Sequence, residues 1–223
     1  MILQTYPDRD LMYLALSNVI AEQVSDQVHS VGRATLSVPG GTSPGPVFDL
    51  LSGVALGWDK VAVVLNDERW VPETNPRSNT ALVRARLLQG RAASATLLPL
   101  YADAEQPEQV LADLSAAIQP HLPITVLLLG MGADMHTASL FPGADRLAEA
   151  LSRDAPILLA MRAAGAAEPR ITLTVPVLQS AQHIHILITG PEKRAALDAA
   201  LLRTPTDAPV RAVLDHATVH WAE

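Results

Sequence analysis

Residues 127–143, LLLGMGADMHTASLFPG, begin with apolar side chains and continue into a loop rich in glycine and polar groups. The apolar part belongs to the run ITVLLL (124–129), which is typical of a strand buried on both faces of a parallel sheet. Gly130 and Gly132 end the strand, and His136 follows in the loop. Because ligands of such sheets bind beyond the carboxyl ends of the strands, this stretch predicts both a fold class and a site.

Other short apolar runs along the chain resemble this strand. Rich in β-branched and aliphatic residues, they predict further strands at 34–38, 61–65, 157–161 and 184–189. Helical patterns lie between the strands, so strands and helices alternate. This order predicts an α/β fold with right-handed crossovers and a mainly parallel sheet flanked by helices.

The first predicted helix is the longest. Apolar residues recur at helical spacing from Met12 to Val31, and either Asp8 or Asp10 is placed to cap it. Shorter helices are predicted at 44–53, 78–88, 106–119 and 192–202. We interpret the Ala-rich stretch 162–169 as a loop within the fold and expect a single domain over residues 1–223.

The composition limits the possible classes of function. With 49% hydrophobic residues the chain can bury a full core, and a net charge of −7 argues against a nucleic-acid surface. Cysteine is absent, which excludes disulfides, thiolate nucleophiles and cysteine-based zinc sites. No apolar run approaches the roughly 20 residues of a membrane span, and MILQTYPDRD (1–10) does not resemble a signal peptide. We expect a cytoplasmic protein with neither nucleic acid nor membrane as a partner, and the sequence predicts no particular oligomeric partner.

The loop after the first of these strands, PGGTSPGPVF (39–48), has the composition of an anion site. Gly40 and Gly41 allow the backbone to approach a ligand closely, and Thr42 and Ser43 offer hydroxyls. Backbone N–H groups at the start of the next helix would complete an anion cradle. An ordinary glycine turn with a Ser/Thr cap explains the same residues.

A second loop, NDERWVPETNPRSN (66–79), opens with adjacent charges. These are Asp67, Glu68 and Arg69. Such a cluster at a strand end costs free energy unless water solvates the charges or a ligand uses them, so a binding loop and an exposed acidic turn both remain open. Ser78 or Asn79 is placed to cap the following helix.

Isolated basic residues and histidines complete the set of candidates. Arg170 precedes an alternating strand, and Lys193, one of only two lysines, lies at a helix start, where it opposes the helix dipole unless an anion is near. A solvated lysine is the alternative. His183 and His185 share a strand face without a third ligand, so we expect no metal site.

These stretches resemble, in the same order, the glucosamine-6-phosphate isomerase/6-phosphogluconolactonase family. The matching motifs cover nearly the whole chain: GGTSP, DERWVP followed by SN, GMGADMHTASLFPG, and RITLTVPVL with GPEK. HTASLFP resembles the lactonase branch, whereas the deaminases have a motif similar to HIAFNEP. The resemblance implies a Rossmann-like sugar-phosphate isomerase/lactonase fold and hydrolysis of 6-phospho-D-glucono-1,5-lactone to 6-phosphogluconate in the oxidative pentose phosphate pathway, without a cofactor.

The resemblance also implies roles for individual residues. His136 would act as the general base that activates water, with Asp134 orienting its imidazole and Arg69 offsetting the charge of the oxyanion. Asp67 and Glu68 would bind sugar hydroxyls or position Arg69. The residues that would bind the phosphate, together with loop N–H groups, are Gly40, Gly41, Thr42, Ser43, Arg170 and Lys193.

Two other functions use a similar pocket. An amino-sugar-phosphate deaminase or isomerase needs an acidic residue that SLFP lacks, and a non-catalytic sugar-phosphate-binding protein needs an output element. One position departs from the family pattern, because Met135 stands where the family usually has glycine. We expect Met135 to adopt an ordinary negative φ and to turn its side chain away from the substrate into apolar surroundings.

Overall fold

The computed structural model describes residues 1–164 and 166–223 and contains a seven-stranded and a three-stranded sheet. Gly165, within the predicted loop 162–169, lies outside the described residues. The strands are β1 Ile2–Thr5, β2 Ala34–Val38, β3 Val61–Leu65, β4 Asp67–Arg69, β5 Thr96–Leu98, β6 Val126–Gly130, β7 Leu158–Met161, β8 Arg170–Leu173, β9 His183–Thr189 and β10 Ala217–Ala222. The α-helices are α1 Arg9–Val31, α2 Gly45–Ser52, α3 Asn79–Arg86, α4 Leu111–Ile118, α5 Leu147–Ala150, α6 Val175–Gln179, α7 Gly190–Ala200 and α8 Arg211–Leu214. Short 3-10 helices cover Trp58–Lys60, Gly90–Ser94, Pro107–Gln109 and Gln119–His121.

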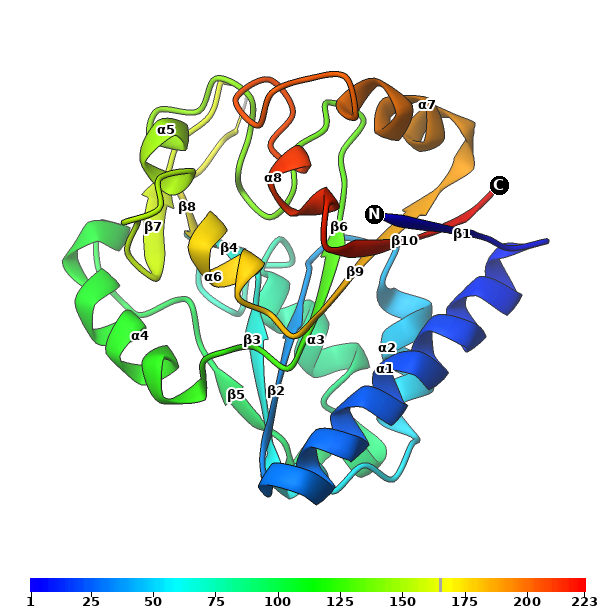
Figure 1. Cartoon of the computed structure of the whole chain (residues 1–223). Coiled ribbons are helices and arrows are strands. Elements are labelled where there is room, and N and C mark those ends of the chain that lie inside the picture. Colours follow the sequence, from blue (N-terminus) through cyan, green and yellow to red (C-terminus); the bar gives the residue numbers. More distant parts are fainter. Residues whose placement is uncertain (165) are drawn as a thin grey trace.

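The large sheet has the order β1-β10-β9-β6-β2-β3-β5, and every neighbouring pair in it is parallel. The long helix α1 packs on β2, β6 and β10, while α7 packs on β9 and β10 (Figure 1). Strands β2 and β3 are buried along their whole length, as their continuous apolar sequences predict. The α/β fold with a mainly parallel sheet is therefore confirmed. Within the described part of the chain, no helix is long and apolar enough to span a bilayer.

The predicted elements agree with the structure in the interior of the sheet. Strands 34–38 and 61–65 match β2 and β3, and Asp8 caps α1 by accepting a hydrogen bond from Leu11 N at 2.8 Å. The edge strand β1 and its neighbour β10 were not predicted. β1 is mostly exposed at the sheet edge, and β10 contains polar residues, so neither has a continuous apolar run.

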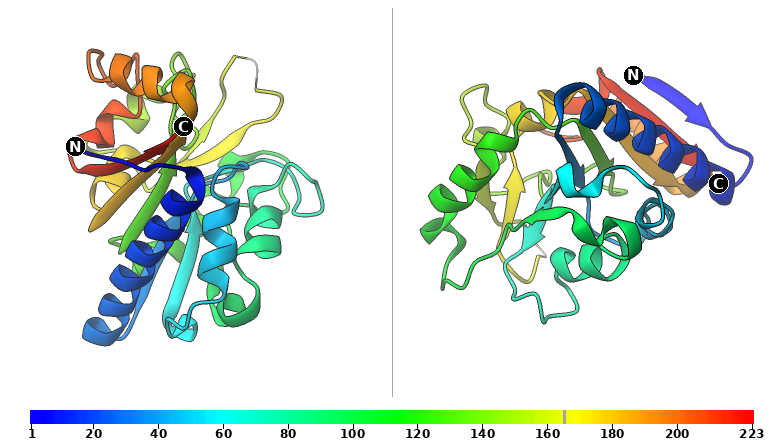
Figure 2. Two further views of the ribbon diagram at one scale, coloured as in Figure 1. Left: turned by 90° about the vertical axis from the view of Figure 1, so that its right-hand side faces the viewer. Right: turned by 90° about the horizontal axis from the view of Figure 1, so that it is seen from below.

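The predicted strand 157–161 forms β7, but it does not belong to the parallel sheet. It pairs antiparallel with β8, which pairs antiparallel with β4, so these three strands form the small sheet (Figure 2). Asn66 joins the two sheets, because its side chain accepts a hydrogen bond from Ser37 Oγ at 2.6 Å and donates one to Leu128 O at 2.7 Å. Its carbonyl also accepts a hydrogen bond from Leu173 N in β8.

A buried polar chain crosses the other end of the large sheet. Its contacts are Tyr6 Oη to His220 Nδ1 at 2.8 Å, His220 Nε2 to His185 Nδ1 at 3.0 Å, and His185 Nε2 to Gln23 Oε1 at 2.9 Å. The amide oxygen of Gln23 can only accept, so His185 Nε2 donates to it and His185 Nδ1 accepts from His220 Nε2. His220 Nδ1 then accepts from Tyr6 Oη, and all three hydrogen bonds form with both imidazoles neutral. Parallel pairing places β9 beside β10, and this brings together His185 and His220, which are far apart in the sequence.

The four polar loops leave the large sheet at the carboxyl ends of its strands. β9, β6, β2 and β3 are consecutive neighbours, and all run parallel, so their carboxyl ends lie side by side. After β2, the chain adds β3 and then β5 on one side of that strand, and it adds β6 on the other side of β2. The carboxyl ends of β2 and β6 are therefore a topological switch point. Loops from β2, β3, β6 and β9 therefore converge on one place.

Candidate active site

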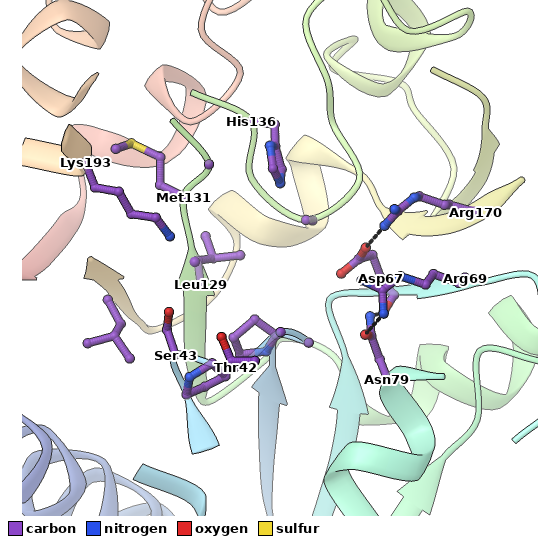
Figure 3. A pocket seen from close by; sticks show the side chains of 18 residues that line it. Thr42, Ser43, Asp67, Arg69, Asn79, Leu129, Met131, His136, Arg170 and Lys193 are labelled. Atoms are coloured by element: carbon purple, nitrogen blue, oxygen red, sulfur yellow. Dashed lines mark hydrogen bonds and ion pairs between the residues drawn. The ribbon is translucent and has the colours of Figure 1, made fainter. Parts of the chain in front are cut away.

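A pocket of about 280 Å³ opens at this convergence. Nine of the residues selected from the sequence line it, namely Gly40, Gly41, Thr42, Ser43, Asp67, Arg69, His136, Arg170 and Lys193. They come from five separate segments of the chain, and Figure 3 shows the side chains of the seven that are not glycine around a common space. Asp134 and Glu68 do not line the pocket and lie behind residues that do.

His136 is held by Asp134, two residues earlier in the same loop. The imidazole Nδ1 lies 2.5 Å from Asp134 Oδ1, which also accepts a hydrogen bond from His136 N at 3.2 Å. Because a carboxylate can only accept, Nδ1 carries the proton and Nε2 keeps a free lone pair. Figure 3 shows the ring directed into the pocket, so Nε2 is available as a base.

Phe141, from the SLFP segment, supports two groups of the pocket. Its ring centroid lies 4.3 Å from that of His136, and the guanidinium of Arg170 lies over the same ring at 5.2 Å. The stacking limits the rotation of the imidazole, and the cation–π contact favours the observed position of Arg170. Phe141 was not selected as a site residue, since one aromatic in a loop has no signal that separates it from core packing.

Basic groups approach the pocket from opposite sides. Figure 3 shows Lys193 on one side and Arg170 with Arg69 on the other, with the hydroxyls of Thr42 and Ser43 between them at the base. Burial lowers the pKa of Arg170 from its ordinary value, and the nearby carboxylate of Asp67 partly opposes this shift. The space between the two sides suits an anion, which would recover part of the solvation lost by the arginine.

Asp67 is a buried carboxylate with protein partners. Ser139 Oγ donates to Asp67 Oδ2 at 2.5 Å, and Arg170 Nη1 lies 3.6 Å from the same oxygen. Asp67 Oδ1 remains for a ligand hydroxyl, because the contacts with Ser139 and Arg170 both use Oδ2. Asp67 thus links the His136 loop to β8 while facing the pocket.

Glu68 does not fit the prediction that it binds substrate. Its side chain is fully buried, and its carboxylate receives hydrogen bonds from β4 and from the start of α3. Side chains alternate along a strand, so Asp67 and Glu68 face opposite sides, and only one of the two neighbours can reach the pocket. The alternative role, in which Glu68 positions Arg69, agrees with the bond from Arg69 N to Glu68 Oε1 at 2.7 Å.

Several pocket residues were not selected from the sequence as site residues. Asn79 is 3% exposed and lines the pocket beside Arg69; the SN pair indicated only a helix cap. Apolar or backbone contributions come from Pro39, Pro44, Leu129, Gly130, Met131, Gly132, Ala138 and Leu187. Among the residues described, no group of three or more histidine and carboxylate side chains is arranged to hold a metal ion.

Comparison with known proteins identifies the family. The model of the glucosamine-6-phosphate isomerases/6-phosphogluconolactonase family matches residues 7–221. The chain belongs to this family. A 6-phosphogluconolactonase from Mesorhizobium japonicum is 44% identical, with 97% of this chain and 93% of that protein covered. Another 6-phosphogluconolactonase, from Rhizobium meliloti, is 40% identical over 93% of each chain.

Solved structures of the family agree with the fold. The crystal structure of a 6-phosphogluconolactonase from Shewanella baltica superimposes with a TM-score of 0.96 at 30% identity, covering 100% of this chain and 98% of that one. The putative 6-phosphogluconolactonase from Neisseria gonorrhoeae gives a TM-score of 0.91 at 32% identity, with both chains fully covered. The Rossmann-like fold expected from the family resemblance is therefore confirmed.

Met135 departs from the expectation for its backbone, since its φ is +67°. The prediction of a negative φ is wrong. The turn explains the value: Met135 N donates to Gly132 O at 3.0 Å and Gly132 N to His136 O at 3.0 Å, so the chain must reverse within five residues. Met135 thus adopts a left-handed conformation, which favours glycine, with a methionine side chain. The side chain is half-buried against the apolar core, as expected.

Proposed function

We propose that this chain hydrolyses 6-phospho-D-glucono-1,5-lactone to 6-phosphogluconate, the reaction of the oxidative pentose phosphate pathway. The observation that carries the proposal is the Asp134-held imidazole of His136 beside a pocket with basic groups on two sides. The family supports it, because the curated relatives described above are named 6-phosphogluconolactonase. The single-domain arrangement and the cytoplasmic location stay predictions.

The proposed chemistry needs one base and no covalent intermediate. Water attacks the lactone carbonyl carbon while His136 Nε2 takes a proton from it, and the carbonyl becomes a tetrahedral oxyanion. Arg69 lies at the pocket wall and offsets the oxyanion charge. When the ring C–O bond breaks, the imidazolium returns the proton to the departing ring oxygen, which becomes a hydroxyl of the product. Asp134 stabilises the imidazolium between these steps.

The proposed binding mode places the phosphate between Arg170 and Lys193. Hydroxyls of Thr42 and Ser43 and the backbone N–H groups of their loop lie at the base of the same space. Charge-assisted hydrogen bonds from a planar guanidinium and an ammonium distinguish a phosphate from a neutral hydroxyl. Asp67 then accepts a hydrogen bond from a sugar hydroxyl through the oxygen that Ser139 leaves free.

A lactonase assay with the spontaneous rate subtracted tests the proposal. We expect turnover of the phosphorylated lactone, no release of ammonia from glucosamine 6-phosphate, and a loss of roughly 10²–10⁴-fold in kcat/KM for His136→Ala. The same variant should still bind 6-phosphogluconate. Ammonia release would support a deaminase, binding without turnover a sugar-phosphate-binding protein, and an active His136→Ala would remove the proposed base.

A further inference from the structure

The carboxylate of Glu68 fixes the start of helix α3 against strand β4. Oε1 accepts hydrogen bonds from Arg69 N at 2.7 Å and Asn79 N at 2.8 Å. Oε2 accepts from Ser78 Oγ at 3.0 Å, Thr80 N at 2.7 Å and Thr80 Oγ1 at 2.8 Å. A fully buried carboxylate with five donors, set at a helix N-terminus, holds both segments in one arrangement.

Asn79 is the first residue of that helix, and its side chain turns back toward the pocket. Nδ2 donates to Asp67 O at 2.9 Å, and Oδ1 accepts from Arg69 Nη1 at 3.3 Å (Figure 3). Both polar atoms of the amide are therefore used by residues that line the pocket.

The guanidinium of Arg69 depends on these contacts. Nη1 also donates to Arg77 O at 2.5 Å, whereas the buried Nε has no hydrogen-bond partner among the described residues. An unpaired buried donor favours rotation toward any acceptor within reach. Asn79 Oδ1 and Arg77 O oppose that rotation by holding Nη1 at two points.

The same amide packs directly on the glycine loop. A Cβ placed on Gly40 would lie 2.0 Å from Asn79 Oδ1 and 2.2 Å from Asn79 Cγ. Gly40 has no left-handed φ, so space alone requires glycine at this position. Asn79 therefore contacts the proposed phosphate loop on one side and Arg69 on the other.

We infer that Asn79 is a positioning residue of the active site: its amide fixes the guanidinium of Arg69 relative to the loop at Gly40 and so sets the distance between oxyanion support and phosphate site. The inference rests on the proposed lactonase function. Asn79 acts through Arg69 and Gly40 and contributes no proton transfer. Its loss therefore lowers kcat more than it raises KM.

A double-mutant cycle on kcat/KM tests the inference. Asn79→Ala should lower kcat/KM about tenfold in the wild-type background and less than about threefold when Arg69 is already alanine, because residues in contact are not additive. Equal factors in both backgrounds would overturn it. If Asn79→Ala does not fold, Asn79→Ser, which keeps a residue suited to a helix start, takes its place in the same cycle.

Ser78→Ala is the matched control. It removes the cap hydrogen bond to Ala81 N and one donor to Glu68, yet leaves the Asn79 amide in place. It should lower the free energy of unfolding and show no coupling to Arg69→Ala. Coupling as large as that of Asn79→Ala would mean that helix stability alone explains the effect, and the inference would fail.

Steric rescue gives an independent measurement. Gly40→Ala should lower kcat/KM by about tenfold or more in the wild-type background, and by less than about threefold when Asn79 is already alanine. If Gly40→Ala costs as much in the Asn79→Ala background as in wild type, the proposed contact between Gly40 and Asn79 is contradicted. If the wild-type protein lacks turnover, the proposed function fails by itself, and the same mutant cycles are then measured on the affinity for 6-phosphogluconate. Additive effects on that affinity would overturn the inference. If the wild-type protein does not bind 6-phosphogluconate either, both the proposed function and the inference fail.

Discussion

Gly132 carries a steric requirement of the proposed catalytic pair. A Cβ at this position would lie 2.2 Å from His136 Nδ1 and 2.3 Å from Asp134 Oδ1. Since Gly132 does not have a positive φ, the requirement is for space alone. The imidazole of His136 and the carboxylate of Asp134 therefore pack directly on the backbone of Gly132.

Gly132→Ala should lower kcat/KM by about 10²-fold, because a displacement of about 1 Å in a catalytic group costs that much. Steady-state kinetics measure it, with circular dichroism to verify the fold. Gly53→Ala is the control, since its new Cβ would meet nothing closer than 3.7 Å. Similar activity of the two variants would contradict the steric argument.

Met135 offers a test of backbone strain. At φ +67° a residue with a Cβ costs roughly 1–2 kcal/mol, whereas glycine does not. Met135→Ala and Met135→Gly both lose the packed thioether, so their difference isolates the backbone. We expect Met135→Gly to be more stable than Met135→Ala by about 1 kcal/mol in urea unfolding. The opposite order, normal for Ala and Gly at negative φ, would refute it.

At the scale of residues, the sequence predicted which side chains come together at the pocket. It did not predict the backbone conformation of Met135 or which of Asp67 and Glu68 points into the pocket. Residue types at strand ends were enough to select His136, Arg170 and Lys193. The φ of Met135 depends on the return of His136 O to Gly132 N, a contact that residue identity does not encode. Likewise, the alternation of β4 decides that Asp67 faces the pocket and Glu68 does not.

At the scale of elements, the small antiparallel sheet brings two arginines together. Arg69 in β4 lies directly opposite Arg170 in β8, and like charges in such a pair repel. Asp67 reduces the repulsion, being 3.6 Å from Arg170. A bound anion would reduce it further, so this arginine pair favours an anionic ligand such as the proposed phosphate. The sequence did not predict this sheet, because a three-residue strand such as β4 has too short a pattern to detect.

Arg170→Ala and Lys193→Ala should each weaken 6-phosphogluconate binding by about 1.5–3 kcal/mol, the usual contribution of a charge-assisted hydrogen bond. Isothermal titration calorimetry measures the loss. On unphosphorylated glucono-1,5-lactone the kcat/KM of both variants should stay near wild type. Lys60→Ala, which removes the other lysine outside the pocket, is the control. Equal losses on both lactones would show that neither residue recognises phosphate.

At the scale of the whole molecule, the buried histidine chain couples folding to pH. Burial lowers the pKa of His185 to about 3 and that of His220 to about 4, from the ordinary 6.5. Between pH 6.5 and these values, the unfolded chain binds protons that the folded chain does not. The free energy of unfolding therefore falls as the pH falls through this window, by up to about 1.4 kcal/mol per pH unit for each histidine.

Urea unfolding at pH 7.5 and pH 5 measures this loss. His185→Gln should lose about 2 kcal/mol less than wild type between the two values, because one depressed imidazole is gone. His216→Gln, at an exposed position, should keep the wild-type loss. Parallel losses in all three proteins would exclude the buried pair as the cause.

The outermost pairing in the large sheet sets an order of events during synthesis. Ile2 pairs with Thr218, so β1 is translated before the other strands of the large sheet yet has no neighbour in it until β10 has emerged. At roughly 5–20 residues per second, that delay is on the order of 10–40 s. The strands that bring the pocket loops together are all translated earlier. The nascent chain can thus bring the pocket loops together before β1 and β10 pair, and we expect that pair to be the last part of the large sheet to form.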